Sequence, residues 1–270
     1  MTIIATGGFS TKNMSIGFFD SVSTEIVVMI FMIISSLPFI LIFQSVKKGN
    51  GDFFNNSQVQ FFLALNLLVI FFVMIWLQKN YEVDYLESLR IASFSVISIA
   101  TGSGFSTYDF SLWGTFTTTL FLFIMLIGGC SGSSSCGLKV FRIQILFKYL
   151  NLHLKKMLKP HIIVASHFNG KKVNESTYES VMSFFFIYIL TFFISALLLS
   201  FSGLDFLTCV SAAASAISNV GPGLGEIIGP YGNYNSLTDY SKVVLLLTMF
   251  LGRLEMLTIL ILFIPSFWRN

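Results

Sequence analysis

Charged residues are scarce in this chain. Asp, Glu, Lys and Arg make up 11% of its 270 residues, whereas about 25% is usual in soluble domains. Hydrophobic residues make up 54% of the chain, and its mean hydropathy is +0.80. This composition excludes an ordinary soluble protein and indicates a protein of the lipid bilayer. The net charge is only +3, and we expect no nucleic-acid partner.

Proline, cysteine and histidine are also rare, at five, three and three residues. With so few prolines the apolar residues form long uninterrupted stretches, which favour membrane helices over the short alternating strands of a barrel. The cysteines are too few and too irregularly spaced for a disulfide framework or a zinc site. They are Cys130, Cys136 and Cys209. A hydrolase that used Ser131 or Cys130 would need a histidine or carboxylate at membrane depth, but the histidines lie in a basic polar stretch. We therefore expect no enzyme.

Four stretches of about 20 apolar residues are long enough to cross a bilayer as helices. They run over Glu25 to Val46, Val59 to Leu77, Val181 to Leu199 and Val243 to Ile264. A fifth, Trp113 to Ile127, gives way to glycines and serines from Gly128 to Gly137 and resumes over Leu138 to Leu150. Irregular backbone at membrane depth survives only inside protein or beside a water-filled cavity. The interruption is therefore a candidate gate.

Two apolar stretches, Leu86 to Ile99 and Phe206 to Ile217, are too short to span and predict half-helices. Each follows a spanning helix and ends in a glycine-bearing loop, at residues 100–107 and 218–225. A similar loop at residues 5–11 is followed by its own span. The chain thus contains two whole units of helix, half-helix, glycine loop and helix, and the tail of another.

Basic residues mark the cytoplasmic side of a membrane protein. Lys47 and Lys48 lie in one connection between units, eight more Lys and Arg residues lie between Lys139 and Lys172, and Arg269 stands near the C-terminus. The glycine loops then face outward, together with a set of carboxylates. These are Asp20, Glu82, Asp84, Glu87, Asp109, Asp205, Glu226 and Asp239. An acidic mouth would concentrate cations, although each acid could equally serve only to solvate its loop.

The glycine loops suit a dehydrated cation. Backbone carbonyls can replace water around the ion, glycine tolerates the dihedrals that aim successive carbonyls inward, and the C-terminal end of a half-helix adds a negative dipole. One such loop would be weak evidence. Three at the same point of a repeated unit predict an ion filter.

At these residues the sequence resembles the Trk/Ktr/HKT superfamily of potassium transporters, most closely membrane subunits of the TrkH and KtrB type. The resemblance implies an all-α polytopic membrane protein in which helix–pore-loop–helix units surround a pseudo-fourfold pore, with a broken helix in the penultimate unit. It implies potassium ion as the bound cation and no organic cofactor. The implied filter residues are Ala5, Thr6, Gly7, Gly8, Thr101, Gly102, Ser103, Gly104, Asn219, Val220 and Gly221. Phe9 and Phe105, which follow filter glycines, are expected to pack behind the loops.

The resemblance also implies a gate in the broken helix and the last helix. Its residues are Gly128, Gly129, Gly132, Gly137, Lys139, Arg142 and Arg253. An arginine at the centre of a lipid-facing helix costs roughly 2.5–3.5 kcal/mol on insertion scales, so Arg253 should face the interior and repel cations until the loop moves. Alternatively, Arg253 forms a structural pair with Glu255 or with loop carbonyls. Lys139 and Arg142 could move with the gate or simply anchor a helix end at the cytoplasmic surface.

The expected organisation departs from the family pattern in two ways. Residues 1–58 would supply the filter strand and second helix of a second unit, 59–150 a third unit, 151–178 a basic cytoplasmic connection, and 179–270 a fourth unit. The first unit and the front of the second would come from a separate chain, or the chain would be an inactive fragment or assembly element. Gly102 and Ser103 stand where family members often carry threonines, which leaves the ion preference open.

The resemblance further implies partners and a location. The expected assembly is a homodimer in the inner membrane of a bacterium, with a cytoplasmic C-terminus and a nucleotide-binding regulatory ring of the TrkA or KtrA type. The basic stretch from Lys148 to Lys172 could dock this ring, or it could attract anionic lipid headgroups.

Overall fold

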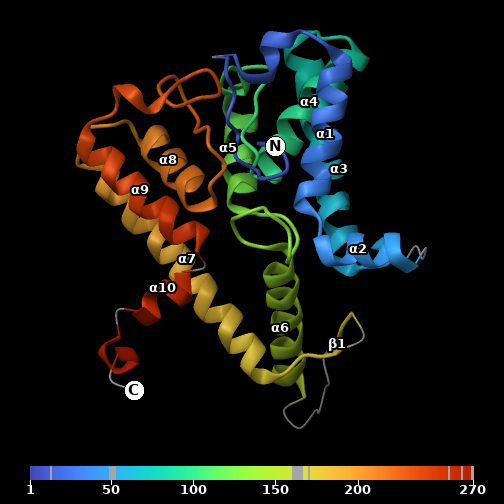
Figure 1. Ribbon diagram of the computed structural model, residues 1–270, viewed down its shortest axis with the longest axis vertical. Coiled ribbons are helices and arrows are strands. Elements are labelled where there is room, and N and C mark those ends of the chain that lie inside the picture. Colours follow the sequence, from blue (N-terminus) through green and yellow to red (C-terminus); the bar gives the residue numbers. More distant parts are fainter. Residues whose placement is uncertain are drawn as a thin grey trace.

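The computed structural model describes residues 1–12, 14–48, 53–159, 167–169, 171–254, 256–262 and 264–268. The α-helices are α1 Val22–Ser36, α2 Phe39–Lys48, α3 Ser57–Tyr81, α4 Tyr85–Ala100, α5 Gly114–Leu126, α6 Val140–Leu158, α7 Glu175–Ser200, α8 Phe206–Ser218, α9 Asp239–Arg253 and α10 Met256–Leu262. Short 3₁₀ turns lie at Ser15–Phe19, Phe110–Leu112, Tyr234–Ser236 and Pro265–Trp268. Strands β1 His167–Phe168 and β2 Lys171–Lys172 form a small antiparallel hairpin. The described chain is thus all-α apart from this hairpin (Figure 1).

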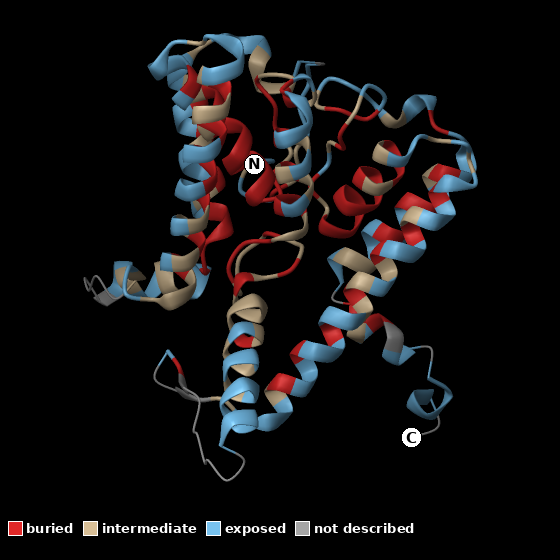
Figure 2. Ribbon diagram, turned by 180° about the vertical axis from the view of Figure 1, so that it is seen from behind, coloured by how far each residue is buried: buried red, intermediate tan, exposed pale blue. Residues whose placement is uncertain are grey.

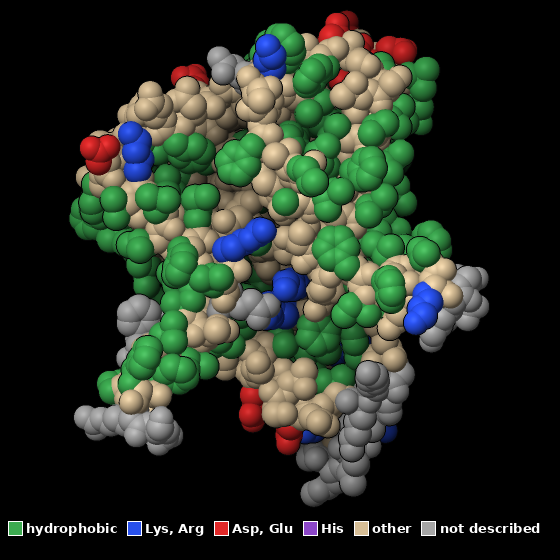
Figure 3. All heavy atoms as spheres, viewed as in Figure 1, with side chains coloured by type: hydrophobic (Ala, Val, Ile, Leu, Met, Phe, Trp, Pro, Cys, Tyr) green, Lys and Arg blue, Asp and Glu red, His purple; other side chains and the backbone are tan. Residues whose placement is uncertain are grey.

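Two helices, α3 and α7, are long and apolar enough to cross a membrane, and a third span results if α1 and α2 are counted as one bent pair. The spans predicted over Val59 to Leu77 and Val181 to Leu199 are therefore confirmed, and both helices extend further at each end. Many large hydrophobic side chains of α3 and α7 are exposed, such as Phe71 and Phe186, and Figure 3 shows hydrophobic side chains over much of the outer surface.

The prediction of one continuous helix from Glu25 to Val46 is wrong. Helix α1 ends at Ser36, and α2 leaves it at an angle of 99°. Pro38 stands at the break; proline lacks a backbone N–H and pushes the residue before it out of the helical region. Leu37 accordingly has extended dihedrals, with φ −93° and ψ 157°.

The helix expected from Val243 to Ile264 is also divided. Helix α9 ends at Arg253, and α10 begins at Met256. Gly252 lies in the last turn of α9, and glycine is about 1 kcal/mol less favourable than alanine within a helix. The low helix propensity of this turn fits an end to the helix here.

Both predicted half-helices are confirmed, as α4 and α8, and they lie at the centre of the protein. Ten residues of α4 and ten of α8 are buried, and Figure 2 shows both helices largely in the colour of buried residues. The buried face of α8 consists mainly of alanine and serine from Ser211 to Ser218. These small side chains let the surrounding helices approach closely, as in other membrane interfaces.

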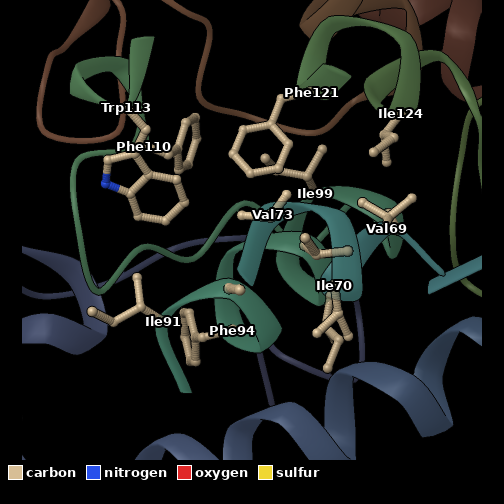
Figure 4. Close-up of a cluster of buried hydrophobic side chains, with 14 of the residues drawn as sticks. Val69, Ile70, Val73, Ile91, Phe94, Ile99, Phe110, Trp113, Phe121 and Ile124 are labelled. Atoms are coloured by element: carbon tan, nitrogen blue, oxygen red, sulfur yellow. The ribbon is translucent and has the colours of Figure 1, made fainter. Parts of the chain in front are cut away.

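The helices of successive units pack against one another in the same way. Helix α1 packs against the half-helix α4 of the next unit, and α5 packs in the same way against α8. The apolar core between α3, α4 and α5 includes Phe94, Phe110 and Phe121 (Figure 4). The rings of Phe110 and Phe121 meet edge to face with centroids 5.1 Å apart. Each half-helix is therefore held from two sides, and its C-terminal end is fixed in place.

The broken helix forms as predicted, with α5 before the break and α6 after it. A single bridge between Ile127 and Leu138 closes the irregular segment at its base. We call residues 128–137 the intramembrane loop.

Candidate functional site

The three glycine loops meet at the C-terminal ends of the half-helices. A Cβ atom placed on Gly8 would lie 2.6 Å from the carbonyl oxygen of Ser103, and one placed on Gly104 would overlap the carbonyl oxygen of Val220. A Cβ on Gly221 would lie 3.9 Å from the Cα of Gly104. Loops separated by about a hundred residues in sequence therefore touch backbone to backbone at their key glycines.

All three loops share one backbone pattern. Two residues separated by a single residue have positive φ at equivalent places in each loop: Thr6 (48°) and Gly8 (65°), Gly102 (69°) and Gly104 (72°), Asn219 (53°) and Gly221 (111°). The residue between them does not have positive φ in any of the loops. Alternation of this kind turns successive carbonyls toward the same side of the chain, which is the arrangement that a carbonyl-lined cation site requires.

A serine at the same position of each half-helix ties its loop down. Ser98 stands six residues before Gly104, and Ser215 six before Gly221. The Ser98 hydroxyl donates to the carbonyl oxygen of Phe105 at 2.6 Å, while the Ser215 hydroxyl accepts from the N–H of Gly221 at 3.1 Å. Ser98 is therefore a donor and Ser215 an acceptor, and each holds the turn that follows its own half-helix.

Residues 106–108, just beyond the predicted filter segment of the third unit, contact the segments that follow the other two glycine loops; we call them the outer collar. The N–H of Gly17 donates to the Ser106 carbonyl at 3.2 Å, and the Ser106 hydroxyl donates to the Pro230 carbonyl at 3.2 Å. The Tyr231 hydroxyl donates to the carbonyl of Thr107 at 2.7 Å. The outer collar thus joins the chain segments that follow the three glycine loops.

An ion pair between a buried carboxylate and a partly exposed arginine supports the outer collar from behind. The Arg90 guanidinium on α4 lies 3.6 Å from the carboxylate of Glu25 on α1 and donates to the Tyr108 hydroxyl at 3.0 Å. Glu25 is 6% exposed, and a buried carboxylate is tolerated when it is paired. The pair links the neighbouring unit, the half-helix and the outer collar.

The intramembrane loop lies directly beneath the glycine loops. The Thr6 hydroxyl donates to the Ser134 carbonyl at 3.1 Å, and the Ser134 hydroxyl donates to the Ile4 carbonyl at 2.9 Å. A Cβ on Gly102 would lie 3.7 Å from the Ser135 hydroxyl. Gly128 and Gly129 are buried, and a Cβ on Gly128 would overlap the Cys136 carbonyl, so the loop is folded tightly on itself.

Cationic side chains line a cavity of about 260 Å³ at this loop. Lys139, Arg142 and Arg253 line it together with Cys136 and Gly137, and Figure 3 shows Lys and Arg side chains in a central hollow. Arg253 donates from Nη1 to the Cys136 sulfur at 2.7 Å, and the Arg142 guanidinium lies 3.7 Å from the centre of the Phe184 ring. Arg253 is exposed in this chain, and it contacts the loop through a sulfur rather than a carbonyl. Its suggested partner Glu255 lies outside the described residues.

The half-helices place negative partial charge beside the glycine loops. Their C-terminal residues, Ala100 and Ser218, lead directly into the glycine segments, so the negative dipole ends face the place where the loops meet. At the other end of α8, Asp205 accepts from the Thr208 N–H at 3.2 Å. Hydrogen bonds from Thr208 hold the pKa of the Asp205 carboxyl below its usual value.

Most of the residues predicted to form a filter come together as described: Thr6, Gly8, Gly102, Ser103, Gly104, Asn219, Val220 and Gly221. Ala5 and Gly7 lie beside Thr6 in the chain. The hydroxyls of Thr101 and Ser103 are hydrogen-bonded at 2.8 Å. Phe105 packs as expected and is 2% exposed, but Phe9 is 79% exposed, so its expected packing role is wrong in this chain. Gly132 of the gate set is exposed and has open space around it.

Sequence reasoning missed two features of the site. Ser98 and Ser215 could have been found by aligning the two whole units on their key glycines. The pairing of Glu25 with Arg90 joins residues 65 apart, and no local pattern signals it. Contact of Arg253 with the loop was expected, but its partner there is the sulfur of Cys136, 117 residues away, and not a carbonyl.

Known proteins resemble this chain over its whole length. The family model TrkH, described as a cation transport protein, matches residues 1–270. The Trk system potassium uptake protein TrkI of Halomonas elongata is 38% identical over 100% of this chain and 55% of its own length. The protein TrkH of Escherichia coli strain K12 is 35% identical over 99% and 55%, respectively. The crystal structure of the potassium transporter TrkH from Vibrio parahaemolyticus superposes with a TM-score of 0.91 at 33% identity, covering 99% of this chain and 57% of that one. The chain therefore spans about half the length of these relatives.

Proposed function

The chain belongs to the TrkH family of cation transport proteins, and we propose that it forms the larger part of the filter and the gate of a potassium-uptake pore in a bacterial membrane. The observation that carries this proposal is the shared backbone pattern of the three glycine loops, which meet at residues 8, 104 and 221. Potassium would bind to carbonyls of these loops, at the negative ends of α4 and α8. Uptake would be driven by the membrane potential, which contributes about 2.3 kcal/mol per charge per 100 mV.

The intramembrane loop and Arg253 would form the gate. A guanidinium beneath the filter repels cations by charge, and its hydrogen bond to Cys136 holds it against the loop. Rearrangement of the loop would therefore move the charge. Lys139 and Arg142 line the same cavity, which favours a part in this movement over a role as surface anchors alone.

The assembly around this chain is also proposed. We infer a dimer of the membrane subunit in the inner membrane, with the basic connection on the cytoplasmic side, the C-terminus there as well, and a nucleotide-binding ring of the TrkA or KtrA type as regulator. The support for this orientation is the distribution of Lys and Arg. The relatives are named as potassium uptake proteins, which favours a transporter over an enzyme.

Potassium uptake in cells that lack their own uptake systems tests the proposal. The chain would be expressed alone and together with the front half of a TrkH relative, because three glycine loops do not make a fourfold filter. We expect uptake on co-expression. Membrane-inserted protein that supports no uptake in either setting would instead favour an inactive fragment or assembly element.

Replacement of the proposed gating charge gives a second test. Arg253→Ala should increase the cation flux of the complete assembly, because the repelling charge is removed. Lys79→Ala, which removes a cation at the far end of α3, is the matched control and should leave the flux unchanged. Equal fluxes in wild type and Arg253→Ala across ionic conditions would contradict the gate.

A further inference from the structure

Helix α2 projects sideways from the molecule (Figure 1), and one of its faces is apolar and uncovered. Ile40 and Phe43 are each 68% exposed and Val46 is 81% exposed, with Phe39 beside them. Gln44 and Lys47 border these side chains and line the same shallow groove. The opposite side of α2 is packed, since Ile42 contacts the core cluster that contains Leu37 and Phe62. The helix is therefore amphipathic, with its second apolar face turned away from the protein.

The geometry of α2 relative to the spans places this face at a membrane surface. Helix α1 runs beside the half-helix α4, and α2 turns from it by 99°, so α2 runs along the membrane plane rather than across it. The spanning helix α3 begins at Ser57, only eight residues after α2 ends. Because a span must begin near one surface of the bilayer, α2 lies at that surface as well.

The charge of α2 matches a membrane surface with anionic headgroups. Lys47 lies on the exposed side of the helix, and the long stem of a lysine can follow apolar surface while its ammonium reaches the headgroups. A helix with Phe, Ile and Val on one side and lysine at the edge is typical of helices that lie among anionic lipids.

The start of α2 is hydrogen-bonded to the intramembrane loop. The Phe39 N–H donates to the Gly132 carbonyl at 3.1 Å, and the Cys130 N–H donates to the Ser36 carbonyl at 2.9 Å. The Ser134 N–H and hydroxyl both donate to the Ser35 carbonyl, at 3.2 and 3.0 Å. Ser35 and Ser36 belong to the end of α1, so a tilt of α2 about its elbow at Pro38 would reach this loop through the hydrogen bond between Phe39 and Gly132.

We propose that α2 is a lipid-binding arm: its apolar face lies in the bilayer surface on the basic side, Lys47 binds the phosphate of an anionic phospholipid, and occupancy shifts the conformation of the intramembrane loop. The lipid contact does not depend on the proposed transport function. The effect of the lipid on the intramembrane loop as a regulator rests on the proposed gate. The ligand class is an anionic phospholipid of the bilayer.

The depth of α2 is measured with nitroxide labels on the full chain in lipid vesicles. A label at Phe43→Cys is compared with Phe71→Cys on the exposed side of α3 and with Glu226→Cys in an exposed loop, all in a Cys136→Ser background because the other two cysteines are buried. We expect Phe43→Cys to be accessible to oxygen and to lie about 5–10 Å below the phosphates. Accessibility to a water-soluble relaxing agent equal to that of Glu226→Cys would overturn the proposal and leave the face to a protein partner.

The lipid class is measured by the retention of spin-labelled phosphatidylglycerol relative to phosphatidylcholine. Lys47→Glu should lower this preference at least fivefold, because the loss of one basic residue at an anionic surface costs roughly 1 kcal/mol and the new carboxylate also repels the headgroup. Lys79→Glu, at the other end of α3, is the matched control and should retain the preference. An unchanged preference in Lys47→Glu overturns the assigned headgroup contact.

Coupling to the loop is measured by alkylation of Cys136, the cysteine that is not buried. We expect its rate to differ at least severalfold between vesicles with and without phosphatidylglycerol, and this difference to disappear in Lys47→Glu. A rate that is independent of lipid overturns the coupling. Because this assay does not involve transport, its outcome is separate from that of the potassium-uptake experiment.

Discussion

Gly104 lies where two of the glycine loops come closest, and a side chain there has no room. In Gly104→Ala the new Cβ would overlap the Val220 carbonyl, and φ is +72°. A left-handed backbone costs an ordinary residue roughly 1–2 kcal/mol, and the overlap adds displacement of Val220. We expect the ratio of sodium to potassium uptake to rise in the complete assembly and the midpoint of thermal unfolding to fall.

Gly203 offers a matched control, because φ is +73° and a Cβ added there would meet nothing within 4 Å. Gly203→Ala should therefore lower the unfolding midpoint without altering ion selectivity. The same selectivity change in both variants would mean that the Gly104 effect is one of general stability and not of filter geometry.

The pair of Glu25 and Arg90 permits a double-mutant cycle. Arg90→Gln leaves a buried carboxylate without its cation and removes the donor to Tyr108, so we expect a loss of stability on the order of 3 kcal/mol. Glu25→Gln in addition should recover part of this loss, because no buried charge remains. The free energy of unfolding in detergent is the readout, and strictly additive single effects would show that the two side chains do not interact.

At the scale of elements, Asp205 is the N-cap of α8. Asp205→Ala should lower the free energy of unfolding by about 0.5–2 kcal/mol at neutral pH, as for other caps. Since the pKa of this carboxyl is lowered in the folded protein, its contribution is fully present above the unfolded pKa of about 3.9 and is lost as the pH falls through the folded pKa. Wild type and variant should therefore converge in stability at strongly acidic pH, and a constant difference would contradict the assignment.

The same elements show how far sequence reasoning reaches. The half-helices α4 and α8 could be predicted because a short apolar run, an acidic start and a glycine end are all local signals. The break between α1 and α2 also has a local cause, Pro38, but the surrounding residues are apolar on both sides and hydropathy alone hides it. The exposed Phe9 occupies the same place in its loop as the buried Phe105, because a repeat in sequence does not fix what packs against each copy.

The candidate site also has one part that could be predicted from the sequence and another that could not. Glycine spacing predicted which residues form the three loops, since positive φ is a property of single positions. Several contacts of the outer collar and of the intramembrane loop join residues more than ninety positions apart, such as Ser106 with Ser15 and Ser134 with Ser35. These contacts depend on how the helices pack, and that information is not carried by any local pattern.

At the scale of the whole molecule, the repeat leaves one helix without its counterpart. The second helix of a unit packs on the next half-helix in the pairs α1 with α4 and α5 with α8. Helix α9 is the second helix of its unit, and an apolar groove of about 400 Å³ lies beside it and the filter glycine Gly221. Leu246 lines this groove and is 63% exposed. By the rotation that relates the other units, a further half-helix should pack here.

The front half of a TrkH relative should supply this half-helix when it is co-expressed. Leu246→Asp would place a charge in the apolar contact and should reduce co-purification of the two parts severalfold, because a buried unpaired carboxylate is costly. Leu190→Asp, on an exposed position of α7, is the matched control for a new charge on a lipid-facing helix. If both variants co-purify equally with the front half, the groove beside α9 is not the place where the ring of units closes, and the fourfold arrangement must be completed through another face.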